Sequence, residues 1–94
     1  MNVRSIQFEW DDVKAESNIR KHRATFKLAS TIFHDPRLLT VADLEHSETE
    51  KRWFSVGCAR NGVTFSVAYR WYDTEPGAAR IRMISARKST RLER

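Results

Sequence analysis

The sequence predicts an α+β fold: a short N-terminal strand, then two helices packed on one face of an antiparallel four-stranded meander. Two observations predict this class. Apolar residues follow helical spacing before Pro36, whereas runs rich in β-branched and aromatic residues, separated by turn signals, follow it. The 94 residues suffice for one domain, 1–94, with a single core.

Polar and apolar residues alternate over Ser5–Trp10, which predicts the short strand. The alternation places three side chains on the core side: Ile6, Phe8 and Trp10. Asp11 or Asp12 then caps a helix that runs to about His22. An aspartate at this position accepts hydrogen bonds from the unpaired amide groups of the first turn and complements the positive end of the helix.

A second helix is predicted after Arg23-Ala24, with Thr25 as its N-cap. Four apolar residues at helical spacing form its buried face: Phe26, Ala29, Ile32 and Phe33. His34-Asp35-Pro36 ends this helix, because proline disfavours the α conformation in the residue before it.

Four strands follow, over 38–44, 52–60, 63–72 and 79–87, from Leu38 to Arg87. Asn61-Gly62 predicts a two-residue type I′ hairpin, since both residue types tolerate positive φ angles. Asp73–Gly77 predicts a looser turn. Ser89–Arg94 can begin a short C-terminal helix, with Ser89 or Thr90 as its cap.

Positive charge is concentrated at the C-terminal end. Residues 80–94 carry six Arg or Lys side chains against Glu93, which equals the net charge of +5 for the whole chain. Cations at alternating positions of a strand can form a row that binds phosphate. The same residues can instead keep a strand edge charged and prevent aggregation. Both interpretations remain open from the charge pattern alone.

Several classes of protein do not fit the composition. No apolar run is long enough for a membrane span, and MNVRSIQFEWDD lacks the hydrophobic region of a signal peptide, so we expect a cytoplasmic protein. The single cysteine, Cys58, cannot form an internal disulfide and lies among strand-like residues, where it is interpreted as a small buried hydrophobe.

Motifs spread over nearly the whole chain resemble the BrnT family of bacterial toxins. These motifs are Trp10-Asp11 with Lys14, Asn18, Lys21 and His22, then Phe26 and Ala29, Asp35-Pro36, Arg52-Trp53, Val56-Gly57 and the run RMISARK from Arg82 to Lys88. The resemblance implies a RelE-like fold and a toxin that blocks translation by cleaving RNA. It also implies a BrnA antitoxin with a ribbon-helix-helix domain, through which the complex binds promoter DNA.

RNA cleavage without a metal needs a base for the ribose 2′-hydroxyl, cations for the crowded phosphorane and an acid for the leaving oxygen. The three histidines, His22, His34 and His46, are scattered, and no Cys/His or carboxylate spacing indicates a metal site. We therefore expect chemistry without metal or other cofactor.

Regular alternation in the last strand places Arg80, Arg82, Ile84 and Ala86 on one face and Ile81, Met83, Ser85 and Arg87 on the other. Arg82 is then the mid-strand cation. Arg87 and Lys88 can join it at a phosphate only where the strand bulges or ends. Arginine suits phosphate because its planar fork forms paired hydrogen bonds. Arg80, Arg91 and Arg94 are interpreted as steering charge. The alternative for Arg82 is an ion pair with Glu9 or Glu45.

Other candidates are a polar row on the first helix and an acidic loop. Lys14, Asn18, Lys21 and His22 share one side of that helix, which has few apolar residues and must be held partly by polar contacts. Imidazole can transfer a proton near neutral pH, so His22 is a candidate acid or base. So are Glu45 and His46, if their loop folds over the sheet.

Arg52 and Arg70 lie on central strands, and Arg70 shares its face with small residues that leave room for a ligand: Thr64, Ser66 and Ala68. Trp53, Phe65, Tyr69 and Trp71 either stack RNA bases or form the core, and we favour the core for Phe65. The sequence thus supports a toxin ribonuclease. The alternative is a non-catalytic module whose basic strand docks RNA or an acidic protein.

Overall fold

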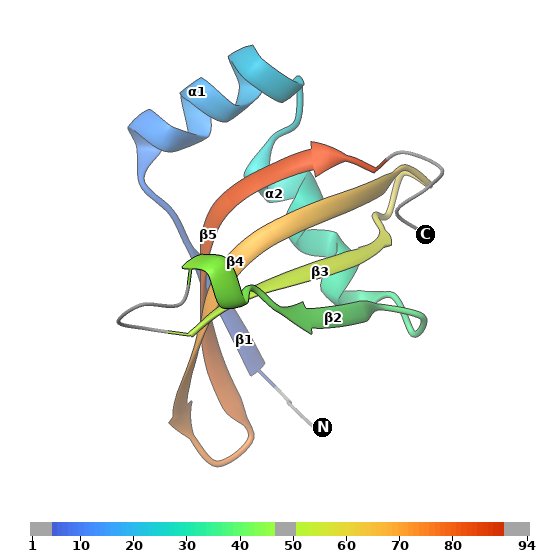
Figure 1. Ribbon diagram of the computed structural model, residues 1–94. Helices are drawn as coiled ribbons and strands as arrows, with labels where there is room; N and C mark the ends of the chain where they lie inside the picture. Colours follow the sequence, from blue (N-terminus) through green and yellow to red (C-terminus); the bar gives the residue numbers. More distant parts are fainter. Residues whose placement is uncertain (1–4, 47–50, 90–94) are drawn as a thin grey trace.

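The computed structural model describes residues 5–46 and 51–89 (Figure 1). Its elements are β1 (Ser5–Glu9), α1 (Asp12–His22), α2 (Phe26–Ala29), the 3-10 helix η1 (Ser30–His34), β2 (Leu39–Ala42), the 3-10 helix η2 (Leu44–His46), β3 (Arg52–Cys58), β4 (Thr64–Glu75) and β5 (Ala78–Lys88). The short C-terminal helix predicted for Ser89–Arg94 lies outside the described residues, apart from Ser89.

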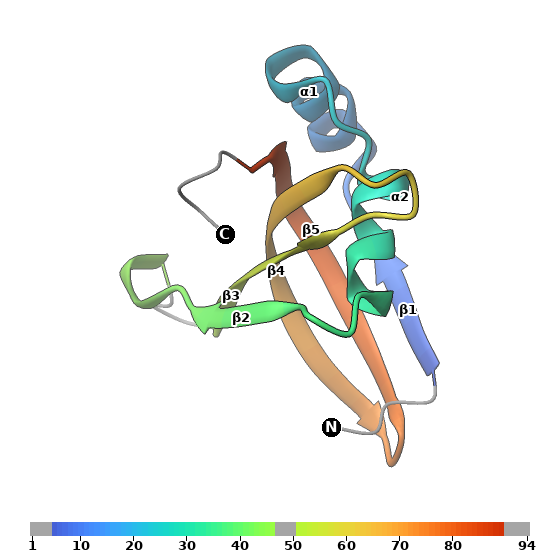
Figure 2. The same ribbon diagram turned by 90° about the vertical axis from the view of Figure 1, so that its right-hand side faces the viewer.

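The sheet has five strands in the order β1-β5-β4-β3-β2. The predicted four-stranded antiparallel meander is therefore incomplete. β2 to β5 do form it, but β1 runs parallel to β5 and makes the sheet mixed. Pairing with β5 satisfies the edge of that strand and lets Ile6 and Phe8 pack against the core. The helices do pack on one face, and η2 projects on the other side (Figure 2).

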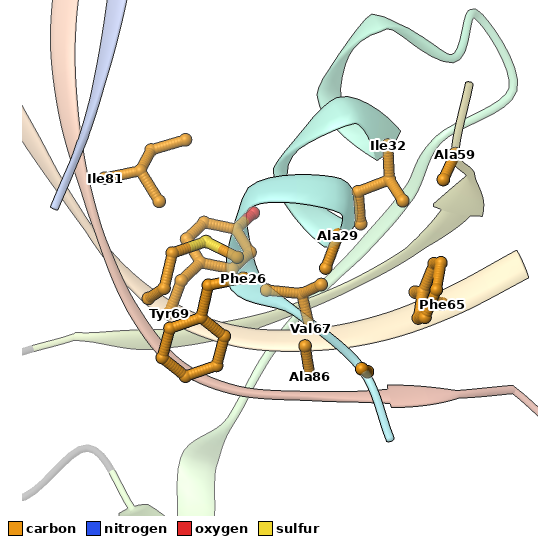
Figure 3. Close-up of a cluster of buried hydrophobic side chains, with 11 residues drawn as sticks. Phe26, Ala29, Ile32, Ala59, Phe65, Val67, Tyr69, Ile81 and Ala86 are labelled. Atoms are coloured by element: carbon orange, nitrogen blue, oxygen red, sulfur yellow. The ribbon is translucent and has the colours of Figure 1, made fainter. Parts of the chain in front are cut away.

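The core forms where α2 and η1 cross this sheet (Figure 3). The predicted stripe is confirmed: Phe26, Ala29 and Ile32 are buried, and Phe33 packs edge-on against Tyr69 with ring centroids 5.0 Å apart. The predicted helix is α-helical only from Phe26 to Ala29 and then tightens into η1. Thr25 caps it as predicted, accepting a hydrogen bond from the Leu28 amide.

A chain of hydroxyl groups crosses this core. The Tyr69 hydroxyl lies 2.6 Å from Ser55 Oγ, which lies 2.8 Å from Thr40 Oγ1. Burial of the Tyr69 side chain raises its pKa, and the hydrogen bonds with Ser55 and Thr40 offset part of that effect. Tyr69 therefore stays protonated in the folded protein to a higher pH than an exposed tyrosine would.

A polar contact holds α1 against the sheet, as the sequence predicted. Val13 and Ile19 are exposed, so apolar burial fixes this helix only weakly. Asn18 is buried instead. Its amide nitrogen donates to the carbonyls of Ala24 (2.9 Å) and Ala86 (2.7 Å), and its amide oxygen accepts from the Ala86 N–H (3.0 Å). β1 pairs with β5 only as far as Arg82. At Ala86, the Asn18 side chain forms the two hydrogen bonds that a neighbouring strand would otherwise form with the β5 backbone.

The hairpin turn between β3 and β4 differs from the prediction. A type I′ turn requires positive φ at both Asn61 and Gly62, but among the described non-glycine residues only Arg23 has positive φ. The Gly62 amide donates to the Ala59 carbonyl (2.9 Å), and Gly62 has φ of 87°. The loop is therefore a three-residue turn in which only the glycine is left-handed. The turn between β4 and β5 is also tighter than predicted, because Glu75 pairs with Ala78 and only Pro76 and Gly77 lie between them.

Replacing Asn18 with alanine is expected to lower the free energy of unfolding by about 2 to 4 kcal/mol, because the buried N–H and C=O of Ala86 lose their partner. Urea denaturation measures this change. Glu16→Ala on the exposed side of α1 is the matched control and should shift stability by less than about 0.5 kcal/mol. Equal stability of the two variants would contradict the role of Asn18.

The raised pKa of Tyr69 predicts an alkaline loss of stability. The unfolded tyrosine releases its proton near pH 10, whereas the folded one retains it, so the free energy of unfolding falls as pH rises above about 10. Urea denaturation between pH 7 and 11 should show a shallower decline in Tyr69→Phe. A decline as steep in Tyr69→Phe as in the wild type would contradict the effect of burial on Tyr69.

Candidate nucleic-acid interface

The sheet has one face that α1, α2 and η1 do not cover, which we call the open face (Figure 2). Strand register identifies the side chains on it, because directly paired residues point to the same side. Arg70 on β4 pairs with Arg52 on β3 and with Arg82 on β5, and Arg82 pairs with Glu9 on β1. Three arginines therefore occupy paired positions on adjacent strands. We call them the arginine row.

A bulge in β5 adds Arg87 to this face and corrects the strand parity predicted above. Tyr69 pairs with Met83 but Ala68 pairs with Ser85, so Ile84 is an extra residue in β5. Beyond the bulge the alternation is shifted by one position. Ala86 is buried on the helix side, and Arg87 pairs with Ser66 on the open face. Arg82 and Arg87 therefore share a face. The sequence prediction placed them on opposite faces unless the strand bulges or ends, and the bulge is present.

Carboxylates balance part of this positive charge. Glu9 Oε1 lies 3.1 Å from Arg80 Nε and 3.8 Å from Arg82 Nη1, and Asp43 Oδ2 lies 3.4 Å from Arg52 Nε. The alternative foreseen for Arg82, an ion pair with Glu9, is therefore present. Arg82 nevertheless has about 41% of its side chain exposed. The two pairs that Glu9 forms are partly exposed and therefore weak enough for a phosphate to compete with them, whereas Asp43 is buried.

The floor of the open face beside Arg87 is made of small residues, as predicted for the Arg70 face. Ser66 and Ala68 are buried between larger neighbours on the sheet. In the strand register they lie between the arginine row and Arg87. Arg80 stacks over the ring of Tyr72, 4.8 Å from its centroid, and this contact fixes the cation closest to the β4–β5 turn.

The remaining predicted residues lie around this face. Lys88 is exposed but follows the parity of Ala86, so it points to the helix side of β5. Lys14, Lys21 and His22 are exposed on α1, within one turn of Asn18 and therefore near the end of β5. Glu45 is exposed on η2, and His46 ends that turn. Arg91 and Arg94 lie outside the described residues.

Most of the predicted aromatic residues do not face the arginines. Phe65 and Tyr69 are buried in the core, and Trp53 pairs with Tyr69 on the helix side of the sheet. Trp71 pairs with Ile81 and also lies on the helix side, whereas Tyr72 and Phe54, which the sequence prediction did not select, lie on the open face. Cys58, predicted to be a small buried residue, is only partly buried.

Some residues of the interface were missed because their partners are distant in sequence. No local sequence pattern links Asp43 to Arg52, and the strand pattern indicates Glu9 only as an alternative partner of Arg82. Asn18 was recognised only as one member of a polar row. A signal for Asn18 did exist: asparagine disfavours helix interiors, so one in mid-helix indicates a specific hydrogen bond.

The chain shares its fold with a solved toxin. The 1.1 Å crystal structure of the ribonuclease toxin BrnT of Brucella abortus superposes with a TM-score of 0.53 over 93% of this chain and 97% of that chain, at 17% sequence identity. No curated protein sequence matches significantly. The chain therefore has the fold of a ribonuclease toxin.

Residues 10–93 match the family model of the ribonuclease toxin BrnT of type II toxin-antitoxin systems. The protein belongs to this family, as its motifs predicted. Membership implies an RNA substrate and an antitoxin partner. None of the helices in the described ranges is long and apolar enough to cross a membrane.

Removing the carboxylate at position 9 is expected to strengthen RNA binding. Glu9→Gln frees Arg80 and Arg82 from a competing anion, which should lower the Kd about threefold to tenfold, or about 1 kcal/mol. Fluorescence anisotropy with a 2′-O-methyl RNA that cannot be cleaved measures the affinity at low salt. Glu16→Gln on α1 changes the net charge equally and should have a smaller effect. Equal effects would indicate long-range charge alone.

Proposed function

We propose that this protein is a metal-independent endoribonuclease that acts in the cytoplasm, cleaves RNA and thereby inhibits translation. A BrnA-like antitoxin with a ribbon-helix-helix domain neutralises it, and the complex binds promoter DNA through that antitoxin. The observation that carries the catalytic part is the placement of Arg82 and Arg87 on one face, over a floor of small residues, by the bulge at Ile84.

In this proposal the RNA backbone follows the open face, and the scissile phosphate lies between Arg82 and Arg87. Attack by the ribose 2′-hydroxyl on phosphorus forms a pentacoordinate phosphorane with additional negative charge. The 5′-oxygen of the next nucleotide then leaves, and a 2′,3′-cyclic phosphate remains. Guanidinium groups held by a rigid strand stabilise that charge more in the transition state than in the ground state.

Groups beside the arginines carry the protons. His22 is brought close to the end of β5 by the contact of Asn18 with Ala86. Glu45 and His46 follow Asp43, whose ion pair with Arg52 holds the start of η2 beside the arginine row. One of these three residues takes the proton of the 2′-hydroxyl, and another protonates the leaving oxygen. Lys88, Lys14, Lys21, Arg52, Arg70, Arg80 and Arg91 attract and orient the RNA.

A second candidate is a non-catalytic module that binds RNA or an acidic protein. The ion pairs of Arg52 with Asp43 and of Arg82 with Glu9 favour it, since they are also what a purely structural charged sheet would contain. The two candidates differ in their products. Only the enzyme generates RNA fragments that end in 2′,3′-cyclic phosphate.

The test incubates the purified full-length chain with RNA in excess EDTA and analyses the fragment ends. Cyclic phosphate ends are expected. Arg82→Ala and Arg87→Ala should each slow cleavage about 10²-fold to 10³-fold, because each removes a cation from the transition state. Arg60→Ala, in the exposed hairpin turn, is the matched arginine control and should cleave at the wild-type rate.

RNA that stays intact while the protein binds it would exclude the nuclease in favour of the binding module. Cleavage that is abolished by EDTA and restored by Mg²⁺ would contradict metal independence. If cleavage occurs but is equally fast in Arg82→Ala and Arg60→Ala, the catalytic site lies elsewhere on the molecule.

A further inference from the structure

A pocket on the helix side of the sheet has no role in the proposed RNA site. Its volume is about 660 Å³, and it lies beside η1, where the helical layer leaves part of the sheet uncovered. Four aromatic side chains line it, Phe33, Trp53, Tyr69 and Trp71, with Lys51 and Asp73 among its polar groups. It is therefore a largely apolar pocket on the opposite side of the sheet from the arginine row.

One border of this pocket is β2, the edge strand of the sheet, which among the described residues pairs only with β3. Its sequence, Leu39-Thr40-Val41-Ala42, contains none of the charges or prolines that usually protect an edge from further pairing. The Asp43 N–H donates to the Arg52 carbonyl. Since such bonds alternate along antiparallel strands, Thr40 and Ala42 direct their backbone N–H and C=O groups away from β3.

The side chains of β2 alternate between exposed apolar residues on the open face and Thr40 and Ala42 on the helix side. Leu39 and Val41 pair with Val56 and Phe54 on the open face and are 58% and 61% exposed. Thr40 points to the other face and lines the pocket. A strand added along β2 would place alternate side chains against Leu39 and Val41 and into the pocket.

The chemistry of this site favours a polypeptide. Outward N–H and C=O groups match an extended backbone, and Lys51 and Asp73 offset one another, so the pocket itself has no excess charge to hold a phosphate. The net charge of +5, which residues 80–94 carry, repels a second copy of the chain and attracts an acidic partner to the molecule as a whole.

We propose that an extended segment of an acidic antitoxin adds to β2 as a sixth strand and anchors an apolar side chain in the aromatic pocket. This inference rests on the proposed function only in taking an antitoxin as the partner. The antitoxin would then bind the toxin at a sheet edge and a pocket that are separate from Arg82 and Arg87.

The test uses the full-length chain and the antitoxin of its own system, purified separately. Ala42→Pro removes one outward N–H donor and leaves the β3 ladder intact, since residue 42 does not donate to β3. It should raise the Kd for the antitoxin at least tenfold. Ala42→Ser, which keeps the N–H, is the matched control and should bind like the wild type.

Hydrogen exchange on the unmodified complex gives a second measurement that does not depend on how a variant folds. The amides of Thr40 and Ala42 should become at least tenfold more protected when the antitoxin binds, while the exposed turn at Asn61 stays unchanged. In a Trp10→Phe background, the fluorescence of Trp53 and Trp71 should shift to shorter wavelength as the pocket fills.

Equal Kd values for Ala42→Pro and Ala42→Ser, with unprotected edge amides, would overturn the inference and leave the nuclease proposal untouched. A dimer of the free chain that Ala42→Pro dissociates would show that β2 binds a second copy instead. Conversely, protection of the edge by the antitoxin, in a protein that cleaves no RNA, would refute the nuclease and retain the docking site.

Discussion

The architecture depends on one buried asparagine. Asn18 binds both backbone groups of Ala86, and through them it fixes the last part of β5, where β1 has ended and no other strand of the described residues pairs with that edge. Without such a contact α1 would have little to hold it, since its apolar residues are largely exposed. The same bonds fix the β5 backbone just before Arg87. A hydrogen bond that stabilises the fold therefore also positions a residue of the proposed site.

The two faces of the sheet differ in composition: one holds the core, and the other carries the proposed RNA site. On the helix side, aromatic and aliphatic residues pack under α2 and η1, and the hydroxyl chain from Tyr69 to Thr40 satisfies the polar atoms within this core. On the open face, arginines lie side by side across three strands, and Glu9 and Asp43 limit their repulsion. The two carboxylates lower the electrostatic repulsion among the arginines in the folded state, and the face as a whole stays positively charged.

Local patterns predicted much of the fold. The caps at Asp11 and Thr25, the end of the helical region at Pro36, the buried stripe of α2 and the four strands of the meander all follow from spacing of a few residues. The parallel pairing of β1 with β5 joins the two ends of the chain, and no local pattern encodes it. The turn at Asn61-Gly62 was predicted in the right place but with the wrong geometry, because a three-residue loop uses the same two residue types. The site was predicted as a set of cations; their grouping depended on a bulge whose position is set by pairing with β4.

The spacing between Arg82 and Arg87 shows how a bulge can be inferred from the sequence of a strand. Five positions separate them, an odd number that a regular strand would translate into opposite faces. Because Ile84 is an extra residue in β5, the side chains after it point to the opposite faces from those that a regular strand would give. Its effect is on the direction of the following side chains. Two functional side chains an odd number of positions apart in a strand can therefore be taken as a signature of a bulge between them. In β5, the bulge is as necessary to the proposed site as the two arginines, because it places both of them on one face.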